Sequence, residues 1–386
     1  MENTLSDLFN RSAGSHLHAF ISGGSSCAEV VRLAEGLCSR TSPDEPLCLW
    51  TQDKTRIAAA LLAAASGGPR IIIPYAFSQQ ALDDAQSSFP FSKLLTGGKD
   101  APPAGCTAIM PESAGPSAPL VYTEGAADTP RVMLFTGGST GKPKLWSKTS
   151  RNLFGEALLL AETFGIGPRD CILATVPPQH IYGLLFSVLV PLVSGCSVLE
   201  PVYSFPQEIL AAARDTCATI LVSVPSQYHV LKTGSLQPYK LRLAFSSAGI
   251  LPAPDAEFFQ EKTGIAVTEI YGSTETGGIA WKASPADRHR CRTFHGIDWK
   301  IHNGRLQVRS DFLSPELPRD QDGFFITADR AEPCGADSFN LLGRADDIVK
   351  VGGRRVDLSE VCDKLKTLSG VRDAVVYAMH ARTGRG

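Results

Sequence analysis

Short apolar runs rich in β-branched residues alternate with longer helical segments along the first part of the chain. The runs at residues 47–50 and 70–74 flank a segment at residues 55–65 that is rich in Ala and Leu. Strands buried in parallel sheets are continuous apolar runs, and the helices that connect them alternate with them in sequence. The pattern therefore predicts an α/β fold with mostly parallel sheets and flanking helices.

The alternation continues as far as Tyr271. We predict strands near residues 132–135, 171–175, 196–199, 219–222, 241–245 and 266–271, and helices near residues 150–164, 205–214, 226–232 and 253–262. Residues 100–119, rich in Pro, Gly, Ala and Ser, are predicted to form a connecting loop. Residues 181–199 carry no charge and are long enough to span a membrane. Gly183, Pro191 and Gly195 interrupt this stretch, which favours a buried helix leading into a buried strand.

The pattern changes near Gly277 to short strands separated by turns. Strands are predicted near residues 279–282, 299–301, 306–308, 323–327 and 339–342, followed by a helix at residues 356–368 and a strand at residues 374–377. We expect a large N-terminal domain over residues 1–342, in which residues 277–342 form a small, β-barrel-like subdomain. Residues 343–386 are expected to be the truncated start of a small α+β C-terminal domain.

The composition is that of a globular protein with a small-molecule substrate. Hydrophobic residues make up 43% of the 386 residues and charged residues 20%, which excludes a disordered or collagen-like chain. The net charge is −2 and no long run of one sign occurs, so the chain lacks the electrostatic footprint of a nucleic-acid or anionic-membrane partner. We expect no nucleic acid and no membrane span.

Ten cysteines are scattered without a C-x-x-C pair, a pattern typical of reduced thiols. Glu2 and Asp7 interrupt any apolar run that could serve as a signal peptide. Both observations favour a cytoplasmic protein. His289, Cys291 and His295 could suggest a metal site, but arginines interleave them and no second pair of ligands lies nearby, which disfavours zinc.

A loop of small and hydroxyl-bearing residues follows the strand predicted at residues 132–135. It reads Thr136-Gly137-Gly138-Ser139-Thr140-Gly141-Lys142-Pro143-Lys144. The backbone N–H groups, hydroxyls and ammonium groups of such a loop can bind an anion such as phosphate. The sequence therefore predicts a phosphate site after this strand.

Two other motifs overlap the loop. A Walker A loop has four residues between its glycines and Ser or Thr after its Lys, whereas here Pro143 follows Lys142. The G-x-S-x-G of a nucleophile elbow is matched by residues 137–141, with Ser139 as nucleophile, but an elbow leads directly into a helix and residues 145–148 look extended. A polar hairpin loop without a ligand is a third alternative.

The loop resembles the phosphate loop of the adenylate-forming superfamily, which comprises acyl-CoA and aryl-CoA synthetases, peptide-synthetase adenylation domains and luciferases. Residues 135–144 depart from that motif only at Gly137, where the family has Ser. Similar matches follow in the family's order at residues 271–275 (Y-G-x-T-E), 327–329 (T-G-D, with Ala328 for Gly), 343–347 and 353–356, with weaker ones at residues 178–180 and 246–249. The ordered set over residues 135–356 is similar to a compact member of this family.

The resemblance implies an AMP-forming acid–thiol ligase that uses ATP and Mg²⁺ and passes the acyl group to CoA or to the phosphopantetheine of an acyl carrier protein. It implies that the catalytic residues are Thr274, Glu275, His180 and Arg355, that Glu275 and Thr140 bind the metal, and that Asp346 is the hinge. The nucleotide-binding residues that it implies are Thr136, Gly137, Gly138, Ser139, Thr140, Gly141, Lys144, Ala248, Gly249, Tyr271, Gly272, Asp329 and Arg344.

The acyl group is expected to bind in a pocket beside the adenylate. The residues that we expect to line it are His180, Tyr182, Gly183, Ser223, Ala248, Gly249, Ser273 and Gly278. They are small, aromatic or weakly polar, and no carboxylate near His180 is placed to bind an α-amino group. An aryl or fatty acid is therefore favoured over an amino acid as the small-molecule partner.

The family's C-terminal domain carries a lysine that is needed for adenylate formation, beyond the point that corresponds to Gly386. We expect this chain to bind nucleotide or acyl-adenylate and to form adenylate slowly. A nucleotide- or acyl-binding module with little catalysis is the alternative to the ligase.

Overall fold

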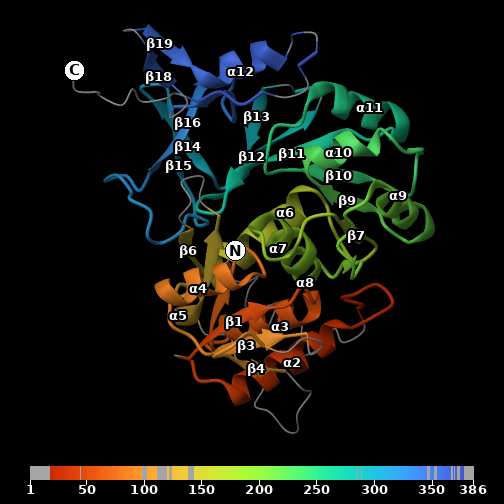
Figure 1. Cartoon of the computed structure of the whole chain (residues 1–386), viewed down its shortest axis with the longest axis vertical. Helices are drawn as coiled ribbons and strands as arrows, with labels where there is room; N and C mark the ends of the chain where they lie inside the picture. The colour runs from red at the N-terminus through yellow and green to blue at the C-terminus, as the bar shows by residue number, and fades with distance from the viewer. Residues whose placement is uncertain are drawn as a thin grey trace. The chain divides into compact units, whose positions relative to one another are not determined.

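The computed structural model describes residues 18–43, 45–97, 102–110, 120, 124–137, 143–284, 286–287, 289–345, 348–351, 354–366, 368, 370–371 and 374–377. The chain divides into two compact units (Figure 1). Unit 1 comprises Met1–Arg288 and Asp311–Leu317, and unit 2 comprises His289–Ser310 and Pro318–Gly386. The domain boundary predicted at residue 342 stays a prediction.

The first sheet of unit 1 has the strand order β4-β3-β1-β2-β5-β6. Its strands are β1 (Pro46–Trp50), β2 (Arg70–Ile73), β3 (Lys93–Thr96), β4 (Thr107–Ile109), β5 (Pro130–Thr136) and β6 (Lys144–Thr149). All neighbours are parallel except β5 and β6, which pair antiparallel. Strand β4 corrects the loop predicted over residues 100–119, because residues 107–109 extend the sheet beside β3 although their side chains are largely exposed.

The second sheet of unit 1 has the order β8-β7-β9-β10-β11-β12. Its strands are β7 (Cys171–Ala174), β8 (Ser197–Val198), β9 (Ile220–Ser223), β10 (Leu243–Ser246), β11 (Val267–Ser273) and β12 (Gly277–Ser284). Strands β7 to β11 are parallel, and β12 returns antiparallel to β11. The prediction of an α/β fold with mostly parallel sheets is confirmed for this unit.

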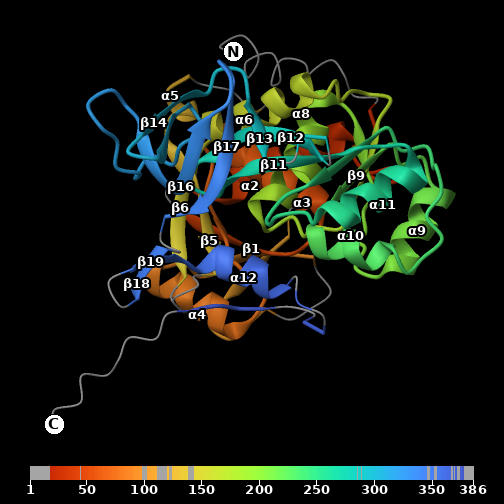
Figure 2. The ribbon, with the colours of Figure 1, turned by 90° about the horizontal axis from the view of Figure 1, so that it is seen from above.

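Helices cover both sheets. They are α2 (Cys27–Arg40), α3 (Lys54–Ala65), α4 (Gln79–Ser88), α5 (Glu124–Ala127), α6 (Ser150–Thr163), α7 (Ile181–Leu184), the π-helix η1 (Leu185–Leu189), α8 (Val190–Ser194), α9 (Pro206–Asp215), α10 (Pro225–Leu231) and α11 (Ala253–Thr263). Helix α3 contacts β2, β5 and η1, η1 contacts β7, and α6 contacts β5, β6 and β12. These helices therefore lie between the two sheets, while α9, α10 and α11 group together beside the second one (Figure 2).

Helix starts follow the capping residues in the sequence. The Asp53 carboxylate accepts from the Arg56 N–H at the start of α3. At α6, Thr149 and Asn152 form a reciprocal capping box, which satisfies two backbone donors that a helix start leaves free. Strand β6 and helix α6 are thus joined without an intervening loop, so that the hairpin and the helix form one continuous structure.

Residues 181–199 form α7, η1 and α8 and then lead into β8, as predicted for a buried helix followed by a strand. Pro191 has no N–H to donate to the Ser187 carbonyl, which is one reason why the helix departs from the α pattern here. Among the described residues, no helix is long and apolar enough to cross a membrane.

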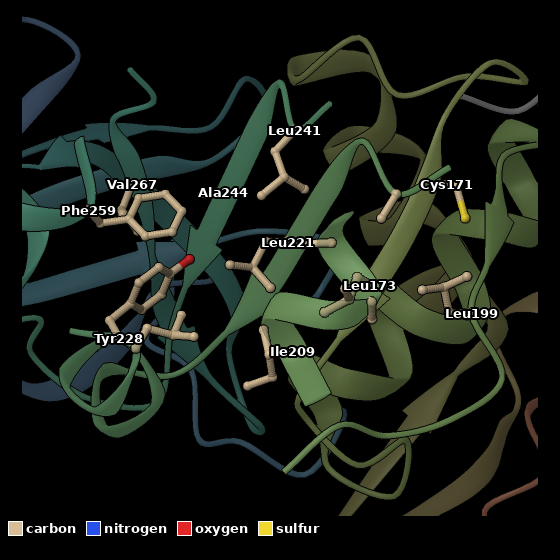
Figure 3. Close-up of a cluster of buried hydrophobic side chains, with 14 of the residues drawn as sticks. Cys171, Leu173, Leu199, Ile209, Leu221, Tyr228, Leu241, Ala244, Phe259 and Val267 are labelled. Carbon is tan, nitrogen blue, oxygen red and sulfur yellow. The ribbon is translucent and has the colours of Figure 1, made fainter. Parts of the chain in front are cut away.

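The core of the second sheet lies between its strands and α9, α10 and α11 (Figure 3). The rings of Tyr228 and Phe259 meet edge to face at 5.1 Å between centroids. The Tyr228 hydroxyl donates to the Phe245 carbonyl at 2.9 Å, so its burial leaves no polar atom unpaired. This core packs the three helices firmly against strands β7, β9, β10 and β11.

Unit 2 is built mainly of antiparallel strands. Its elements are β13 (Arg290–Thr293), β14 (Asp298–His302), β15 (Arg305–Arg309), β16 (Phe325–Pro333), β17 (Ser338–Arg344), β18 (Ile348–Val351), β19 (Arg354–Asp357) and α12 (Leu358–Lys366). Strands β14 to β17 pair in sequence order, β17 also pairs with β13, and β18 pairs with β19. The strand predicted at residues 374–377 is wrong, because these described residues form no strand and the side chains of Val375 and Tyr377 are exposed.

Candidate functional site

A cavity of about 340 Å³ lies in unit 1 where five strands end. Thr136 ends β5, Thr175 follows β7, Val224 follows β9, Ala248 follows β10 and Thr274 follows β11. Among the described residues, those that line the cavity are Leu134, Phe135, Thr136, Thr175, Val176, Pro177, Gln179, His180, Ile181, Tyr182, Val224, Ala248 and Thr274. Ligands of open α/β sheets bind at the carboxyl ends of the strands. The position and the size of the cavity suit a small-molecule site.

The hairpin of β5 and β6 supplies one wall of the cavity. Thr136 and Lys144 are paired across the hairpin, and the Thr136 hydroxyl donates to the Lys144 carbonyl at 3.4 Å. Lys144 and Gly137 are exposed. The predicted loop residues Gly138, Ser139, Thr140 and Gly141 lie outside the described residues. A strand rather than a helix follows the loop, as expected for a phosphate hairpin and not for a nucleophile elbow.

The turn between β11 and β12 presents Thr274 to the cavity. The Ser273 N–H donates to the Thr276 hydroxyl at 3.1 Å, and the Thr276 N–H donates to the Ser273 hydroxyl at 3.2 Å. The Thr276 hydroxyl also donates to the Gly277 carbonyl at 2.9 Å. These local bonds fix the turn that carries the predicted residues Thr274 and Glu275.

Two of the predicted glycines lie at the root of this turn. A Cβ atom on Gly272 would come within 2.3 Å of the Gly277 carbonyl oxygen, so only glycine fits between the two strands. Gly278 is buried, and its N–H donates to Glu156. Neither glycine nor Ser273 lines the cavity; each one shapes the hairpin that carries Thr274.

The segment from Val176 to Tyr182 forms the opposite wall. His180 precedes α7, and burial lowers the pKa of its imidazole, which favours the neutral ring at pH 7. Burial raises the pKa of the Tyr182 phenol well above its usual range. Gly183 lies beneath the wall, where a Cβ atom would come within 2.2 Å of the Pro177 carbonyl oxygen. The helix can therefore approach the loop before it only through a glycine.

The loop after β10 contributes a strained residue. Ala248 lines the cavity with a φ of 67°, in the left-handed region that costs a non-glycine residue about 1–2 kcal/mol. The Ser247 hydroxyl donates to the Ile270 carbonyl at 2.9 Å and fixes the start of this loop. Gly249 is exposed and does not line the cavity. Such strain is often retained at ligand sites.

Some polar atoms around the cavity have hydrogen-bond partners and others have none among the described residues. The Thr175 and Ser223 hydroxyls are 2.8 Å apart, so Ser223 supports the wall from behind and does not itself line the cavity. The Gln179 side-chain oxygen is buried and has no hydrogen-bond partner among the described residues. A ligand that offers a donor at this point would satisfy it.

The remaining predicted residues belong to other parts of the structure. Tyr271 lies on β11 opposite Ala280 and is not among the lining residues. In unit 2, Asp329 and Arg344 face each other directly across β16 and β17. The backbone of Arg355 lies in β19, and Asp346 lies outside the described residues. The roles implied for these residues stay predictions.

A buried charged cluster behind the turn was not predicted. Lys148 is 1% exposed, and its ammonium donates to the Phe312 carbonyl at 2.9 Å and to the Glu275 carbonyl at 3.4 Å. Burial lowers its pKa to about 8, against the opposing influence of Glu156, Glu275 and Glu316. Burial raises the pKa of Glu156, whose carboxylate accepts the Gly278 N–H at 2.6 Å.

Known proteins share the sequence of much of the chain. A family model described as AMP-binding enzyme matches residues 28–323. Sulfoacetate–CoA ligase of Cupriavidus necator is 28% identical over 307 residues, which cover 72% of this chain and 60% of that protein. The 3,4-dihydroxybenzoate–[aryl-carrier protein] ligase of Bacillus anthracis is 24% identical over 254 residues, covering 65% of this chain and 60% of that protein. The chain thus spans 60% of the length of these relatives.

Solved structures share the fold. O-succinylbenzoate coenzyme A synthetase of Bacillus subtilis, in complex with AMP, superimposes with a TM-score of 0.82 at 19% identity. The match covers 98% of this chain and 86% of that one. The large N-terminal domain of such a synthetase therefore has the fold seen in unit 1.

Proposed function

The chain belongs to the AMP-binding enzyme family, and from this premise we propose that it activates a carboxylic acid with ATP and transfers the acyl group to a thiol. The match confirms the adenylate-forming family that the motifs between residues 135 and 356 predicted. The observation that carries the proposal is the cavity at the strand ends, where Thr136, His180, Ala248 and Thr274 meet.

In the proposed reaction a carboxylate oxygen bonds to the α-phosphorus of ATP, and the bond from that phosphorus to the bridging oxygen breaks to release pyrophosphate. The thiol sulfur then bonds to the acyl carbon, AMP leaves with the electron pair of the broken C–O bond, and the thiol proton passes to solvent. Both reactants of the first step are anions, so the protein must mainly position them and offset charge.

The residues around the cavity fit these tasks. The Thr274 hydroxyl lines the cavity as a donor for phosphate oxygens, and the neutral ring of His180 on the opposite wall can accept or donate a hydrogen bond. Mg²⁺, when bound, would neutralise phosphate charge, and it binds through one or two carboxylates and substrate phosphates. Glu275 supplies a carboxylate next to Thr274, which fits this pattern.

The lining also bears on the acid. None of the thirteen described lining residues is Asp, Glu, Lys or Arg, and most are apolar. Among these thirteen residues a second charged group on the acyl chain would find no Lys or Arg as counter-ion, which favours an aryl or fatty acid. The relatives name both CoA and an aryl-carrier protein as acceptors, and for this chain either thiol remains a candidate.

Acid-dependent exchange of labelled pyrophosphate into ATP tests the proposal. We expect benzoates, cinnamates or fatty acids to support exchange better than dicarboxylates do. Thr274→Val should lower the rate by about 10²-fold, because a donor to developing charge is lost while the shape is kept. A panel in which only dicarboxylates or amino acids support exchange would contradict the assignment of the acid.

Binding is measured beside turnover by calorimetry with ATP and a non-hydrolysable acyl-adenylate analogue. Ligand binding without exchange would favour the binding module over the ligase.

A further inference from the structure

The carbonyl of Glu275 is held from two sides. The Lys148 ammonium donates to it at 3.4 Å, and the Ser314 N–H donates to it at 2.8 Å. Glu275 follows Thr274, which lines the cavity. The position of the turn therefore depends on contacts from parts of the chain distant in sequence, as well as on its own local bonds.

Ser314 belongs to a short segment, Asp311–Leu317, that packs with unit 1; we call it the strap. Lys148 donates to the Phe312 carbonyl of the strap, and the Ser147 N–H and hydroxyl both donate to Glu316 at 2.6 Å. Strand β6, the second strand of the β5–β6 hairpin, is thus bonded to the strap, and both are bonded to the turn. Lys148 connects all three.

The acidic partner is supplied by helix α6. Glu156 is 4% exposed and accepts the Gly278 N–H, directly after the turn. Gly277 has a φ of 68°, and a Cβ atom there would come within 2.8 Å of the Glu156 carboxylate and 2.7 Å of Phe312. The carboxylate and the strap therefore close around the backbone of the hairpin.

Burying an ammonium and a carboxylate is costly, and apolar residues of similar volume often give equal or greater stability. Stability alone therefore does not account for Lys148 and Glu156 at this place. Buried charges are, however, suited to fixing backbone groups, because charged hydrogen bonds are short and directional. The groups fixed here are those that carry Thr274 and Glu275.

We propose that Lys148 is a positioning residue for the ligase reaction: together with Glu156 and the strap it holds the 273–276 turn so that Thr274 and Glu275 face the phosphates of ATP. This inference rests on the proposed function. Lys148 acts through the backbone of the turn and does not touch the substrate.

The chain offers a matched control. Lys54 is 0% exposed, and its ammonium donates to the carbonyls of Leu199 and Glu200, neither of which lines the cavity. Lys54→Met and Lys148→Met remove the same group from the same kind of environment. A difference between them reports on what each lysine holds.

The first measurement is hydrogen exchange in the ligand-free protein, which needs no assumption about function. Lys148→Met should raise exchange in a peptide covering residues 273–278 by about 10- to 100-fold, the factor expected when a charged hydrogen bond is lost. Lys54→Met should leave that peptide within about twofold of the wild type. Equal exchange in the two variants would overturn the positioning role.

The second measurement is the affinity for ATP by calorimetry, with and without Mg²⁺. Lys148→Met should reduce the gain in affinity that Mg²⁺ gives by about tenfold, whereas Lys54→Met should retain it, because only the first variant releases a carboxylate that binds the ion. Lys148→Arg should recover part of the gain. If Lys148→Met does not fold, Glu156→Gln replaces it: it keeps an acceptor for Gly278 but removes the negative charge that favours the Lys148 ammonium, so the change should have the same direction and a smaller size.

The two proposals fail differently. A wild-type protein that binds neither ATP nor the acyl-adenylate analogue would contradict the proposed function. A wild type that binds both, with a Mg²⁺ effect unchanged in Lys148→Met, would contradict the role of Lys148 alone.

Discussion

Lys54 and Lys148 lie in two regions of unit 1 that share their local chemistry and differ in what surrounds them. Each lysine is fully buried and donates to two backbone carbonyls, and burial lowers the pKa of each ammonium to about 8. Lys54 holds the chain just after β8, away from the cavity. Lys148 holds the residue next to Thr274. Each buried lysine therefore holds a segment of backbone in place. Its importance for function depends on whether that segment carries residues of the cavity.

The largest expected effect on stability comes from replacing the glutamate near each lysine. Glu156 is buried beside Lys148, whereas Glu200 is exposed and contacts Lys54 through its carbonyl. Glu156→Leu should destabilise the protein by about 3–5 kcal/mol, since it removes the buried acceptor of the Gly278 N–H and one of the three carboxylates that offset the charge of Lys148. Glu200→Leu should cost about 0–1 kcal/mol, because the carbonyl that accepts from Lys54 is kept and the side chain that is replaced is exposed. Denaturant unfolding measures both, and similar losses would remove the distinction.

The pH dependence of the unfolding free energy measures the burial cost of Lys54, the lysine away from the cavity. The pKa of Lys54 is about 8 in the folded protein and 10.5 in the unfolded chain. Below pH 8 the ammonium is charged in both states and its burial cost is present in full. Between pH 8 and 10.5 the folded state has released the proton and the unfolded chain still binds it, so the free energy of unfolding should rise by up to about 3 kcal/mol.

Lys54→Met should lack this rise. The check is the difference in unfolding free energy between wild type and variant across pH 7–10.5, in which the other titrating groups cancel. A constant difference would show that Lys54 keeps an ordinary pKa.

Two glycines on either side of β7 in the sequence, Gly167 and Gly183, allow a similar comparison. Gly183→Ala places a methyl group 2.2 Å from the Pro177 carbonyl oxygen under the cavity wall. We expect a loss of about 1–3 kcal/mol in stability from overpacking, together with weaker binding of the acyl-adenylate analogue. Gly167→Ala, at the amino end of β7, meets no atom within 4 Å and should leave binding unchanged. Equal binding by the two variants would exclude Pro177 from the acyl site.

The smallest effect is expected at Ala248. Ala248→Gly relieves the strain of the left-handed backbone but raises the conformational entropy of the unfolded chain. The free energy of unfolding should therefore rise by only about 0.5 kcal/mol. Analogue binding should weaken, because the loop becomes less preorganised. Asn303, with a φ of 52°, provides the control, since Asn tolerates this conformation and Asn303→Gly should change little. Tighter binding in Ala248→Gly would contradict a role for the strained backbone.

Much of the fold could be predicted because buried parallel strands are continuous apolar runs. The strands near Cys171 and Ile220 were located within one or two residues for this reason. Helix α2 and strand β4 were missed, since α2 mixes charged and apolar positions and β4 is short and exposed. Local patterns carry little information about such elements.

The candidate site was predicted in part for a different reason. Motifs on turns and strand ends pointed to Thr136 and Thr274, which the cavity brings together from two sheets. Lys148 and Glu156 gave no such signal, because a charged side chain in a sequence is usually taken to face solvent. Their burial depends on the strap, which is distant in sequence from both. Only tertiary packing could reveal the cluster.

The most direct test of the proposed function is the affinity for an aryl acyl-adenylate analogue with a non-hydrolysable linkage, measured by calorimetry against AMP and the free acid. If the cavity binds the acyl and nucleotide parts together, the analogue should bind about 10²–10⁴-fold more tightly than AMP, and Thr274→Val should weaken it. An analogue that binds no more tightly than AMP would contradict a site for the acyl-adenylate in this cavity.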